Sequence, residues 1–405
     1  MQIKLNSYQI KMVFFSCLIL VDGLMVMDFI NPSLPYMMHD LSASQSSMKG
    51  LMIAYMMSLG IAQLFHGPFS DNHGRKKTIL LGLVIAIFGL FFSIISYNIV
   101  FLYFSRLLTA AGLASTAVIS RALISDVCHD EYSMRKAFSF WAMFGQLSPS
   151  IAPLAGGIIQ ERWSWHVSFG VLFSINLIVF LVIALFMPES HQSSDKKSIF
   201  FEQVHILIEL AKNKRFCLFS VLSALIFVFT IGFYSLSPFV FHEMKISASE
   251  NGLLYIPFVL GMLLGAFSLS SILSQVKSEK LFFVGLFWYW LICFFFFIVF
   301  LFFKENILLI VVFSFMLSFN SGLMAPLSLN MCLEGFKANK GSASAAQGFV
   351  KMFLTGVSLL IFNFIEIKYF YALVCIFLII SSVMLSLYYF LFIKNTLREH
   401  AFLIE

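Results

Sequence analysis

The sequence predicts an all-α membrane protein with twelve transmembrane helices arranged in two pseudo-symmetric bundles of six. Of its 405 residues, 60% are hydrophobic and only 11% are charged, whereas soluble domains carry about 25% charged residues. A soluble core of this size could not hide so much apolar surface, so lipid is the expected solvent. Apolar stretches of about 20 residues, long enough to cross a hydrocarbon layer of about 30 Å, recur along the whole chain.

Each apolar stretch is expected to form a helix, because a segment alone in lipid can satisfy its backbone groups only within itself. The stretches are also too long and too continuous for the strands of a barrel. The predicted spans are residues 12–36, 49–69, 78–97, 99–122, 137–160, 166–187, 216–240, 250–273, 281–303, 306–330, 342–365 and 369–393.

The lysine and arginine residues predict how these spans are oriented. If the N-terminus lies inside and the sides alternate, 19 of the 26 fall in inside segments and five in outside loops. An excess of lysine and arginine is typical of cytoplasmic loops. We therefore expect both termini in the cytoplasm of a bacterial-type cell, with the chain in its inner membrane. The two remaining cations, Arg106 and Lys351, fall inside spans.

The longest loop is polar and basic, and it divides the chain into two halves. We expect an N-terminal six-helix bundle over residues 1–187, a cytoplasmic linker over residues 188–215, and a C-terminal bundle with a short tail over residues 216–405. Residues 200–211 are amphipathic and are predicted to lie along the membrane surface. Two bundles with a site near the midplane are typical of secondary transporters.

Acidic residues inside the spans are the first functional candidates. Asp22 and Asp28 both lie well inside the first span, and such residues are costly in lipid. At about 1.5 Å per residue, Asp28 matches the depth of Arg106, and Asp22 matches the depth of Lys351. We expect these pairs, with Asp28 able to exchange a proton. The alternative for each acid is a permanent ion pair that only fixes helix packing.

The loop after the second span carries a recognisable signature. Its residues run Gly67-Pro-Phe-Ser-Asp71-Asn-His-Gly74-Arg75-Lys76-Lys77, and they resemble the signature between helices 2 and 3 of the major facilitator superfamily. A glycine turn there would present an acid and cations to neighbouring helix ends and latch one conformation. The resemblance implies that Gly67, Asp71, Gly74 and Arg75 form this latch. Asn72 departs from the family pattern, which usually has Arg.

The fifth span carries a second match. The stretch Ser148-Pro149-Ser-Ile-Ala-Pro153-Leu-Ala-Gly156-Gly157 is similar to the antiporter motif of drug exporters in this superfamily. Small residues let helices approach closely, and proline bends a helix where packing can re-satisfy the backbone. The resemblance assigns Pro149, Pro153, Gly156 and Gly157 to this motif, although Ser148 and Ala152 replace family glycines.

Three further segments extend the resemblance. Arg106 is followed six residues later by Gly112, as in helix 4 of the family. The first span around Asp28 and residues 341–348 are similar to MdfA-type and Bcr/CflA-type multidrug/proton antiporters. The resemblance implies twelve spans in the major facilitator fold and export of lipophilic compounds in exchange for protons. Asp28 is the matched acid and Arg106 the matched cation, whereas Asp22 does not align without a gap.

The central cavity is expected to be lined by helices 1, 4, 7 and 10. Aromatic residues and flexible methionines suit promiscuous apolar substrates. The candidate lining residues are Asp28, Phe29, Tyr234, Phe239, Asn320, Met324 and Lys351, and the candidate proton-coupling residues are Asp28, Arg106 and Asp22. The expected partners are small lipophilic substrates, protons and the lipid bilayer, with no nucleic acid, no cofactor and no metal, in a monomer.

Two other function classes stay open. A dedicated exporter of one metabolite or siderophore would share this topology. A membrane-embedded enzyme or a receptor is the third class, but the sequence has no phosphate-binding Gly-Lys-Ser/Thr loop, and its cytoplasmic loops are too short for a catalytic domain. The sequence therefore favours a transporter over an enzyme.

Overall fold

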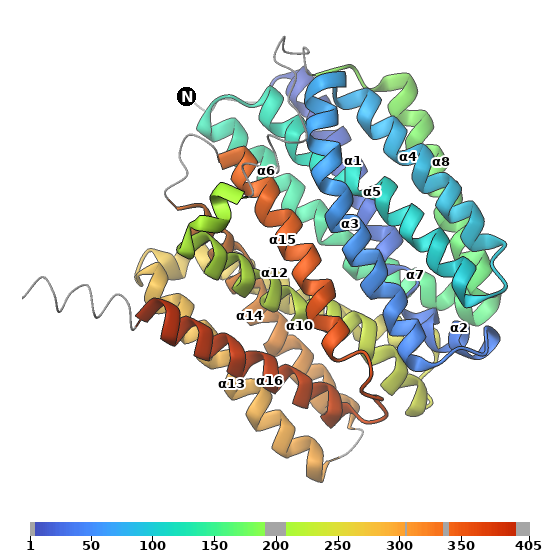
Figure 1. Cartoon of the computed structure of the whole chain (residues 1–405), viewed down its shortest axis with the longest axis vertical. Coiled ribbons are helices and arrows are strands. Elements are labelled where there is room, and N and C mark those ends of the chain that lie inside the picture. Colours follow the sequence, from blue (N-terminus) through green and yellow to red (C-terminus); the bar gives the residue numbers. More distant parts are fainter. Residues whose placement is uncertain (1–4, 191–207, 304–305, 335–339, 394–405) are drawn as a thin grey trace, which may run out of the picture. The chain divides into compact units, whose positions relative to one another are not determined.

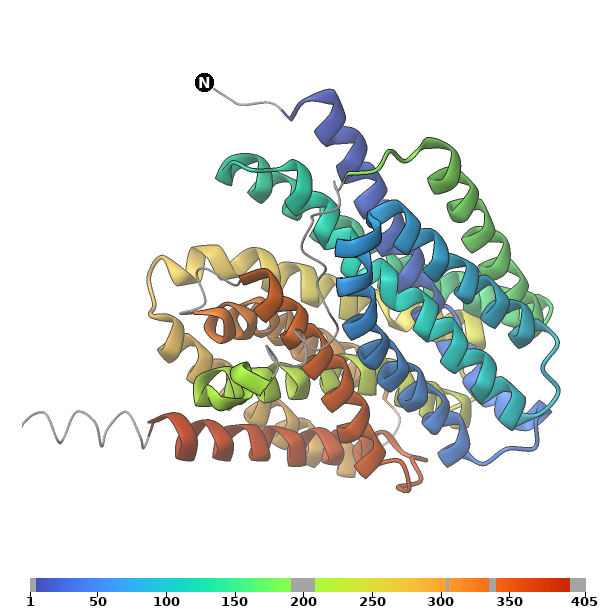
Figure 2. The same cartoon turned by 45° about the horizontal axis from the view of Figure 1, so that its top comes forward.

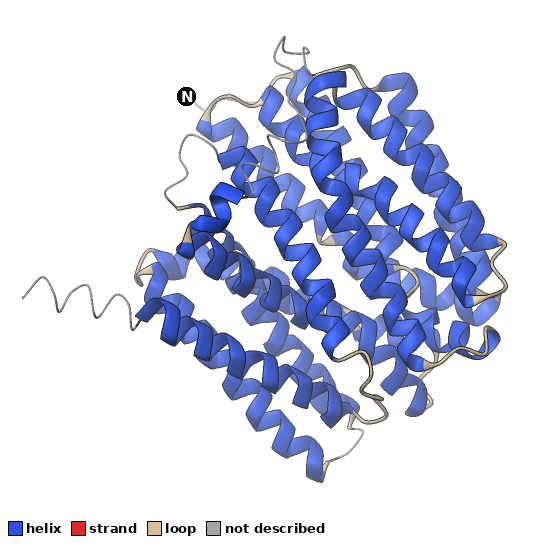
Figure 3. Cartoon of the chain, in the orientation of Figure 1, coloured by secondary structure: helices blue, strands red, loops and turns tan. Residues whose placement is uncertain are grey.

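The structure is a computed structural model that describes residues 5–190, 208–303, 306–334 and 340–393. Within these residues every regular element is a helix and none is a strand, as Figure 3 shows. By helix contacts the chain divides into two compact units. Most of the predicted surface segment, residues 200–211, lies outside the described residues, and only its last four residues fall within them.

The first unit comprises Met1–Ile206 and Ile246–Tyr255. Its helices are α1 (Ser7–Asp28), the 3-10 helix η1 (Asn31–Ser33), α2 (Leu34–Asp40), α3 (Gln45–His73), α4 (Arg75–Ile94), α5 (Ile99–Val127), α6 (Glu131–Gly145), α7 (Leu147–Arg162), α8 (Trp165–Phe186) and α11 (Ala248–Leu254). Helices α3, α5, α4 and α8 lie side by side in both views of the chain (Figures 1 and 2). Helix α1 packs against α5, α6, α7 and α8.

The second unit comprises Leu207–Lys245 and Ile256–Glu405. Its helices are α10 (Lys214–Glu243), α12 (Ile256–Leu273), α13 (Ser278–Phe302), α14 (Ile307–Leu333), α15 (Lys340–Ile361), α16 (Phe370–Tyr388) and the short π-helix η2 (Tyr389–Ile393). Helix α14 packs against α10, α12 and α13, while α16 packs against α13 and α10.

Eleven helical stretches of the described chain are long and apolar enough to cross a membrane, so the prediction of a multi-pass helical membrane protein is confirmed. Helix α15 occupies the position of the eleventh predicted span, and its apolar part, Ala346–Ile361, is shorter than the other eleven stretches. The sequence did not predict three interruptions. The first span breaks at η1, α6 and α7 meet at Gln146, and α11 and α12 meet at Tyr255.

Side-chain caps fix where many of the helices begin. In each case the side chain accepts the amide hydrogen three residues later, which satisfies a donor that the helix leaves unpaired and contributes about 1 kcal/mol. The capping residues are Asn6, Ser44, Asn98, Asp130, Asn213, Ser247 and Asn306. Hydrogen bonds from the side chain and amide of Ser133 also lower the pKa of the exposed Asp130 below its ordinary value.

Small residues bring α4 and α5 into close contact. A side chain at Gly82, Gly89 or Gly112 would meet the backbone of the facing helix. Without a hydrophobic drive between helices in lipid, this close van der Waals packing holds them together. The outer surface is apolar, with exposed side chains such as Phe88, Leu185 and Phe186. The first unit therefore has a closely packed centre and a surface suited to lipid.

Candidate functional site

Three buried ionisable side chains of the first unit come from residues that the sequence analysis singled out inside spans. Asp22 and Asp28 on α1 are each 2% exposed, and Arg106 on α5 is fully buried. Helix α1 approaches α5 closely at Gly23, where a side chain would overlap the Thr116 hydroxyl. Buried ionisable residues in a membrane span are rare and expensive, so they mark this region as the candidate site.

The Asp28 carboxyl has a hydroxyl partner. Ser148 Oγ donates a hydrogen bond to Asp28 Oδ2 at 3.3 Å, and Ser148 stands at the start of α7 beside Pro149 in the predicted antiporter motif. The expected ion pair between Asp28 and Arg106 was wrong, because no such pair occurs among the residues that the structure describes. The acid thus contacts the motif helix rather than the buried cation.

The Arg106 guanidinium is held by a carbonyl and an aromatic ring. Its Nη1 donates to the Val26 carbonyl at 3.5 Å, and its Cζ lies 4.2 Å from the centroid of the Tyr55 ring. The negative face of an aromatic ring attracts such a cation. The depth estimate correctly predicted that Arg106 lies beside the part of α1 that contains Asp28. The rotation of α1 about its axis, however, places the Val26 carbonyl, and not the Asp28 carboxyl, next to the guanidinium.

Tyr55 on α3 provides the ring beside the buried guanidinium. The Arg106 Cζ lies over this ring, and the Tyr55 side chain is fully buried. The sequence analysis missed this residue, because one tyrosine among 13 carries no signal of its own. Only the packing of α3 against α5 reveals its place above the guanidinium.

The Asp22 carboxyl is bound by an amide. Asn176 Nδ2 on α8 donates to Asp22 Oδ2 at 2.8 Å. The predicted partner Lys351 belongs to the second unit, where its Nζ lies 4.6 Å from the centroid of the Phe227 ring. Asn176 was also missed, although a signal was available, since an amide in an otherwise apolar span favours an interhelical hydrogen bond.

The predicted latch residues gather around Arg75. Gly74 separates α3 from α4 with a φ of +93°, a conformation that glycine adopts without steric cost. The Arg75 guanidinium then binds Asp71 on the last turn of α3 and the Ser70 hydroxyl. Gly67 lies one turn earlier, and its carbonyl accepts the Ser70 hydroxyl at 2.9 Å.

Two acids that the sequence analysis did not single out complete this cluster. Asp126 near the end of α5 accepts two hydrogen bonds from Arg75, from Nε at 2.9 Å and from Nη2 at 3.2 Å. Glu189 accepts the backbone amides of Arg75 at 2.8 Å and Lys76 at 3.1 Å, and a carboxylate at a helix N-terminus is stabilising. The cluster therefore ties together the ends of α3, α4 and α5 and the chain after α8.

The glycines of α7 mark two close backbone contacts. A side chain at Gly156 would overlap the Phe29 carbonyl, and one at Gly157 would overlap the Ala248 carbonyl of α11. Pro149 lies in the first turn of α7, where its missing amide hydrogen is tolerated, and Pro153 lies in its interior. The predicted motif residues thus pack α7 against the end of α1 and against α11.

The remaining cavity candidates lie in the second unit, apart from the buried Phe29. Asn320 Nδ2 donates to the Gly285 carbonyl at 2.8 Å, and the Met324 sulfur lies where a side chain at Gly285 would go. Tyr234 packs edge-on against Phe258, and Phe239 is buried in α10. Asn320 and Met324 thus tie α14 to α13, and the cavity assignments stay predictions.

A match to a family model shows to which family the chain belongs. The Major Facilitator Superfamily model matches residues 15–359. The chain belongs to the Major Facilitator Superfamily. The family prediction is therefore confirmed, and the chain is a transporter of this superfamily, not an enzyme.

Individual relatives extend this result. The chain is 25% identical over 354 residues to an MFS-type transporter, YdgK, of Bacillus subtilis, covering 86% of this chain and 87% of that protein. It is 28% identical over 173 residues to Multidrug resistance protein D of Escherichia coli, covering 43% of this chain and 44% of that protein. The latter match thus spans less than half of the relative's length.

A solved structure supports the fold. The crystal structure of a D-xylose–proton symporter matches with a TM-score of 0.75 at 13% identity, covering 93% of this chain and 97% of that one. At this identity the similarity shows the fold alone. This major facilitator protein therefore shares its overall fold with that solved structure.

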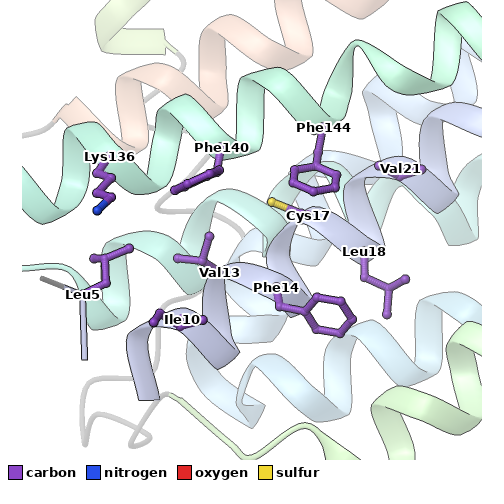
Figure 4. A pocket seen from close by; sticks show the side chains of 10 residues that line it. All are labelled: Leu5, Ile10, Val13, Phe14, Cys17, Leu18, Val21, Lys136, Phe140 and Phe144. Atoms are coloured by element: carbon purple, nitrogen blue, oxygen red, sulfur yellow. The ribbon is translucent and has the colours of Figure 1, made fainter. Parts of the chain in front are cut away.

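A separate apolar groove lies between α1 and α6 of this major facilitator protein. Its volume is about 690 Å³, and Lys136 is the charged residue that lines it. Figure 4 shows Phe140 and Phe144 of α6 facing the side chains of α1, among them Phe14 and Cys17. The groove contains none of the predicted cavity residues, so it is distinct from the cluster of buried charges.

Proposed function

We propose that this chain is a proton-coupled transporter that exports lipophilic small molecules by alternating access. The observation that carries the proposal is the buried Asp28 carboxyl, which has a hydroxyl partner on α7 and, among the residues that the structure describes, no cation at ion-pair distance. A buried carboxylate without a cation is poorly stabilised, because it has lost its contact with water. It therefore tends to bind a proton or a substrate. Similarity to Multidrug resistance protein D supports lipophilic drugs as the substrate class.

The proposed architecture has twelve spans in two six-helix bundles, with α15 as the eleventh span. In this arrangement residues 1–187 and 216–405 form the bundles, residues 188–215 form the cytoplasmic linker, and both termini lie in the cytoplasm of a bacterial inner membrane. The excess of inside cations supports this orientation. In this proposal the protein works as a monomer. Its cavity residues are Phe29, Tyr234, Phe239, Asn320, Met324 and Lys351.

The contacts of Asp28 suggest how its protonation is coupled to helix movement. Ser148 binds the carboxyl at the start of α7, and the same helix touches the Phe29 carbonyl at Gly156. Protonation removes the negative charge that attracts the Ser148 hydroxyl and weakens this hydrogen bond. The proton state of Asp28 would thereby shift the balance between two positions of α7.

The Arg75 cluster is the proposed conformational latch. Its ion pairs join helix ends through short contacts to Asp71 and Asp126, so movement of those ends requires the contacts to separate. Such discrete contacts favour two distinct arrangements over continuous bending. Gly67, Asp71, Gly74 and Arg75 thus act in the transport cycle without touching the substrate.

Proton release by the purified protein in detergent tests this function directly. Adding a lipophilic drug to the wild-type protein is expected to release protons, because drug and proton compete for Asp28. Asp28→Asn should abolish the release, whereas Glu366→Gln, at an exposed acid paired with Lys368, should leave it unchanged. Undiminished proton release by Asp28→Asn would exclude Asp28 as the coupling acid.

A further inference from the structure

We propose that Asp22 and Asn176 form a cyclic carboxylic acid–amide pair that keeps one proton bound throughout the transport cycle. In this pair the Asn176 amide donates to one carboxyl oxygen, and the protonated second oxygen donates back to the amide oxygen. The pair itself is independent of the transported substrate. Its consequence for coupling, that Asp28 alone exchanges the proton, rests on the function proposed above.

The first half of the pair is present as a hydrogen bond. Asn176 Nδ2 donates to Asp22 Oδ2 at 2.8 Å, between two residues that are 154 positions apart in the chain. Asp22 is 2% exposed and Asn176 is fully buried. The two side chains thus meet across the contact between α1 and α8, away from solvent.

The second half follows from two buried acceptors. Asp22 Oδ1 and Asn176 Oδ1 are both buried, and neither has a hydrogen-bond partner among the described residues. An ionised carboxylate and an amide oxygen are acceptors only, so neither can satisfy the other. A proton on Asp22 Oδ1 turns that oxygen into a donor and gives both groups a partner.

The charged groups around Asp22 also favour a protonated Asp22 carboxyl. Asp28 lies on the same helix as Asp22, and α5, which packs against that helix, carries Arg106 and Arg121, whose guanidinium groups each donate to a backbone carbonyl. An ionised Asp22 without an ion pair would be costly in a low dielectric, and a proton on its carboxyl removes that cost.

No cation lies at ion-pair distance from Asp22 in the part of the chain that the structure describes. Lys136 on α6 is the charged residue that lines the apolar groove between α1 and α6, and Val21, the neighbour of Asp22, also lines this groove. On α8 the titratable residue is His166, ten positions before Asn176 or about 15 Å along the helix. On α7 the charged residues Glu161 and Arg162 lie at its far end.

The pair would divide the two acids of α1 by role. Asp22 would remain neutral and join α1 to α8, while Asp28 would gain and lose the proton that is exchanged for cargo. Substitution by asparagine separates these roles, because two facing amides can form the same cyclic pair without any ionisable group. Asp22→Asn should therefore preserve the contact, whereas Asp22→Ala should lose it.

Infrared spectroscopy of the purified full-length protein tests the pair without any substrate. At about pH 9, well above the ordinary range of an aspartic acid, the wild-type protein should still show the carbonyl stretching band of a protonated carboxylic acid. Asp22→Asn should remove that band, and Asp28→Asn should leave it in place. A wild-type spectrum without an Asp22-dependent band at this pH would overturn the proposal.

The swapped double variant provides the matched control. Asn176→Ala should lower the thermal unfolding midpoint, because it leaves the buried carboxyl without its amide. Asp22→Asn combined with Asn176→Asp re-creates the pair in the opposite order and should restore both the midpoint and the infrared band. If the swapped protein is no more stable than Asn176→Ala, the reciprocal pair does not exist.

Drug-triggered proton release then separates this proposal from the proposed function. Asp22→Asn should retain the release within about twofold, since one neutral partner replaces another in the same geometry. Loss of release in Asp22→Asn, with wild-type release intact, would show that Asp22 exchanges its proton and would overturn the inference. Absence of release in the wild-type protein would instead contradict the proposed transport function, while the infrared result would still decide the pair.

Discussion

At the scale of single residues, the unusual feature is a buried guanidinium held by a carbonyl and a ring. Arg106 has two nitrogens, Nε and Nη2, without a hydrogen-bond partner among the described residues. Its positive charge is therefore stabilised by the nearby Tyr55 ring and by the Val26 carbonyl.

The Tyr55 ring should matter more than its hydroxyl group. Tyr55→Leu is expected to destabilise the protein by about 1–3 kcal/mol, since it removes the cation–π contact and leaves a cavity. Tyr55→Phe keeps the ring, and the hydroxyl that it removes has no hydrogen-bond partner within the described part of the chain, so its effect should be close to zero. Thermal unfolding in detergent measures both, and an equal loss in the two variants would contradict the role of the ring.

The residues of the site differ in how far the sequence could predict them. Asp22, Asp28 and Arg106 stood out because charges are rare inside apolar spans. Tyr55 and Asn176 were missed, and Ser148 was noted only as a departure from the motif, because the contacts of all three depend on how each helix is rotated about its axis. Depth along a helix can be counted from the sequence, but the rotation is set by tertiary packing.

At the scale of elements, the junction between α3 and α4 is a single glycine surrounded by carboxylates. The resemblance to the superfamily signature implied a glycine turn that presents an acid and cations to neighbouring helix ends. It could not predict that Asp126, 51 residues from Arg75, would bind the same guanidinium. That contact depends on α5 ending beside the turn, which is a property of the packed unit and not of the loop.

The two acids of this junction should contribute unequally. Asp126 is 14% exposed and binds Arg75 through two hydrogen bonds, whereas Asp71 is 42% exposed and binds it through one. Asp126→Asn is therefore expected to cost about 1–3 kcal/mol and Asp71→Asn about 0–1 kcal/mol, because solvent screens the more exposed pair.

Thermal unfolding midpoints of the two single variants, measured beside the wild-type protein, decide the ranking. A loss in Asp71→Asn that equals or exceeds the loss in Asp126→Asn would contradict the assignment of Asp126 as the main partner of Arg75. Glu366→Gln again serves as the control, since Glu366 lies in an exposed ion pair.

At the scale of the whole molecule, hydropathy alone predicted most of the fold. Eleven of the predicted spans match helical stretches long and apolar enough to cross a membrane, because the cost of burying backbone in lipid leaves few alternatives to helices. The breaks within the first, fifth and eighth spans escaped prediction, since an apolar run looks the same whether or not it contains a turn. Family membership followed from short motifs and agrees with the match over residues 15–359.

The central claim, that Asp28 couples cargo to protons, is tested most directly by transport in proteoliposomes under an imposed pH gradient. Wild-type protein should accumulate a lipophilic drug against its concentration gradient and discharge the pH gradient as it does so. Asp28→Asn should still equilibrate the drug downhill but accumulate none, because a neutral amide cannot exchange a proton. Uphill accumulation by Asp28→Asn at the wild-type level would contradict the account.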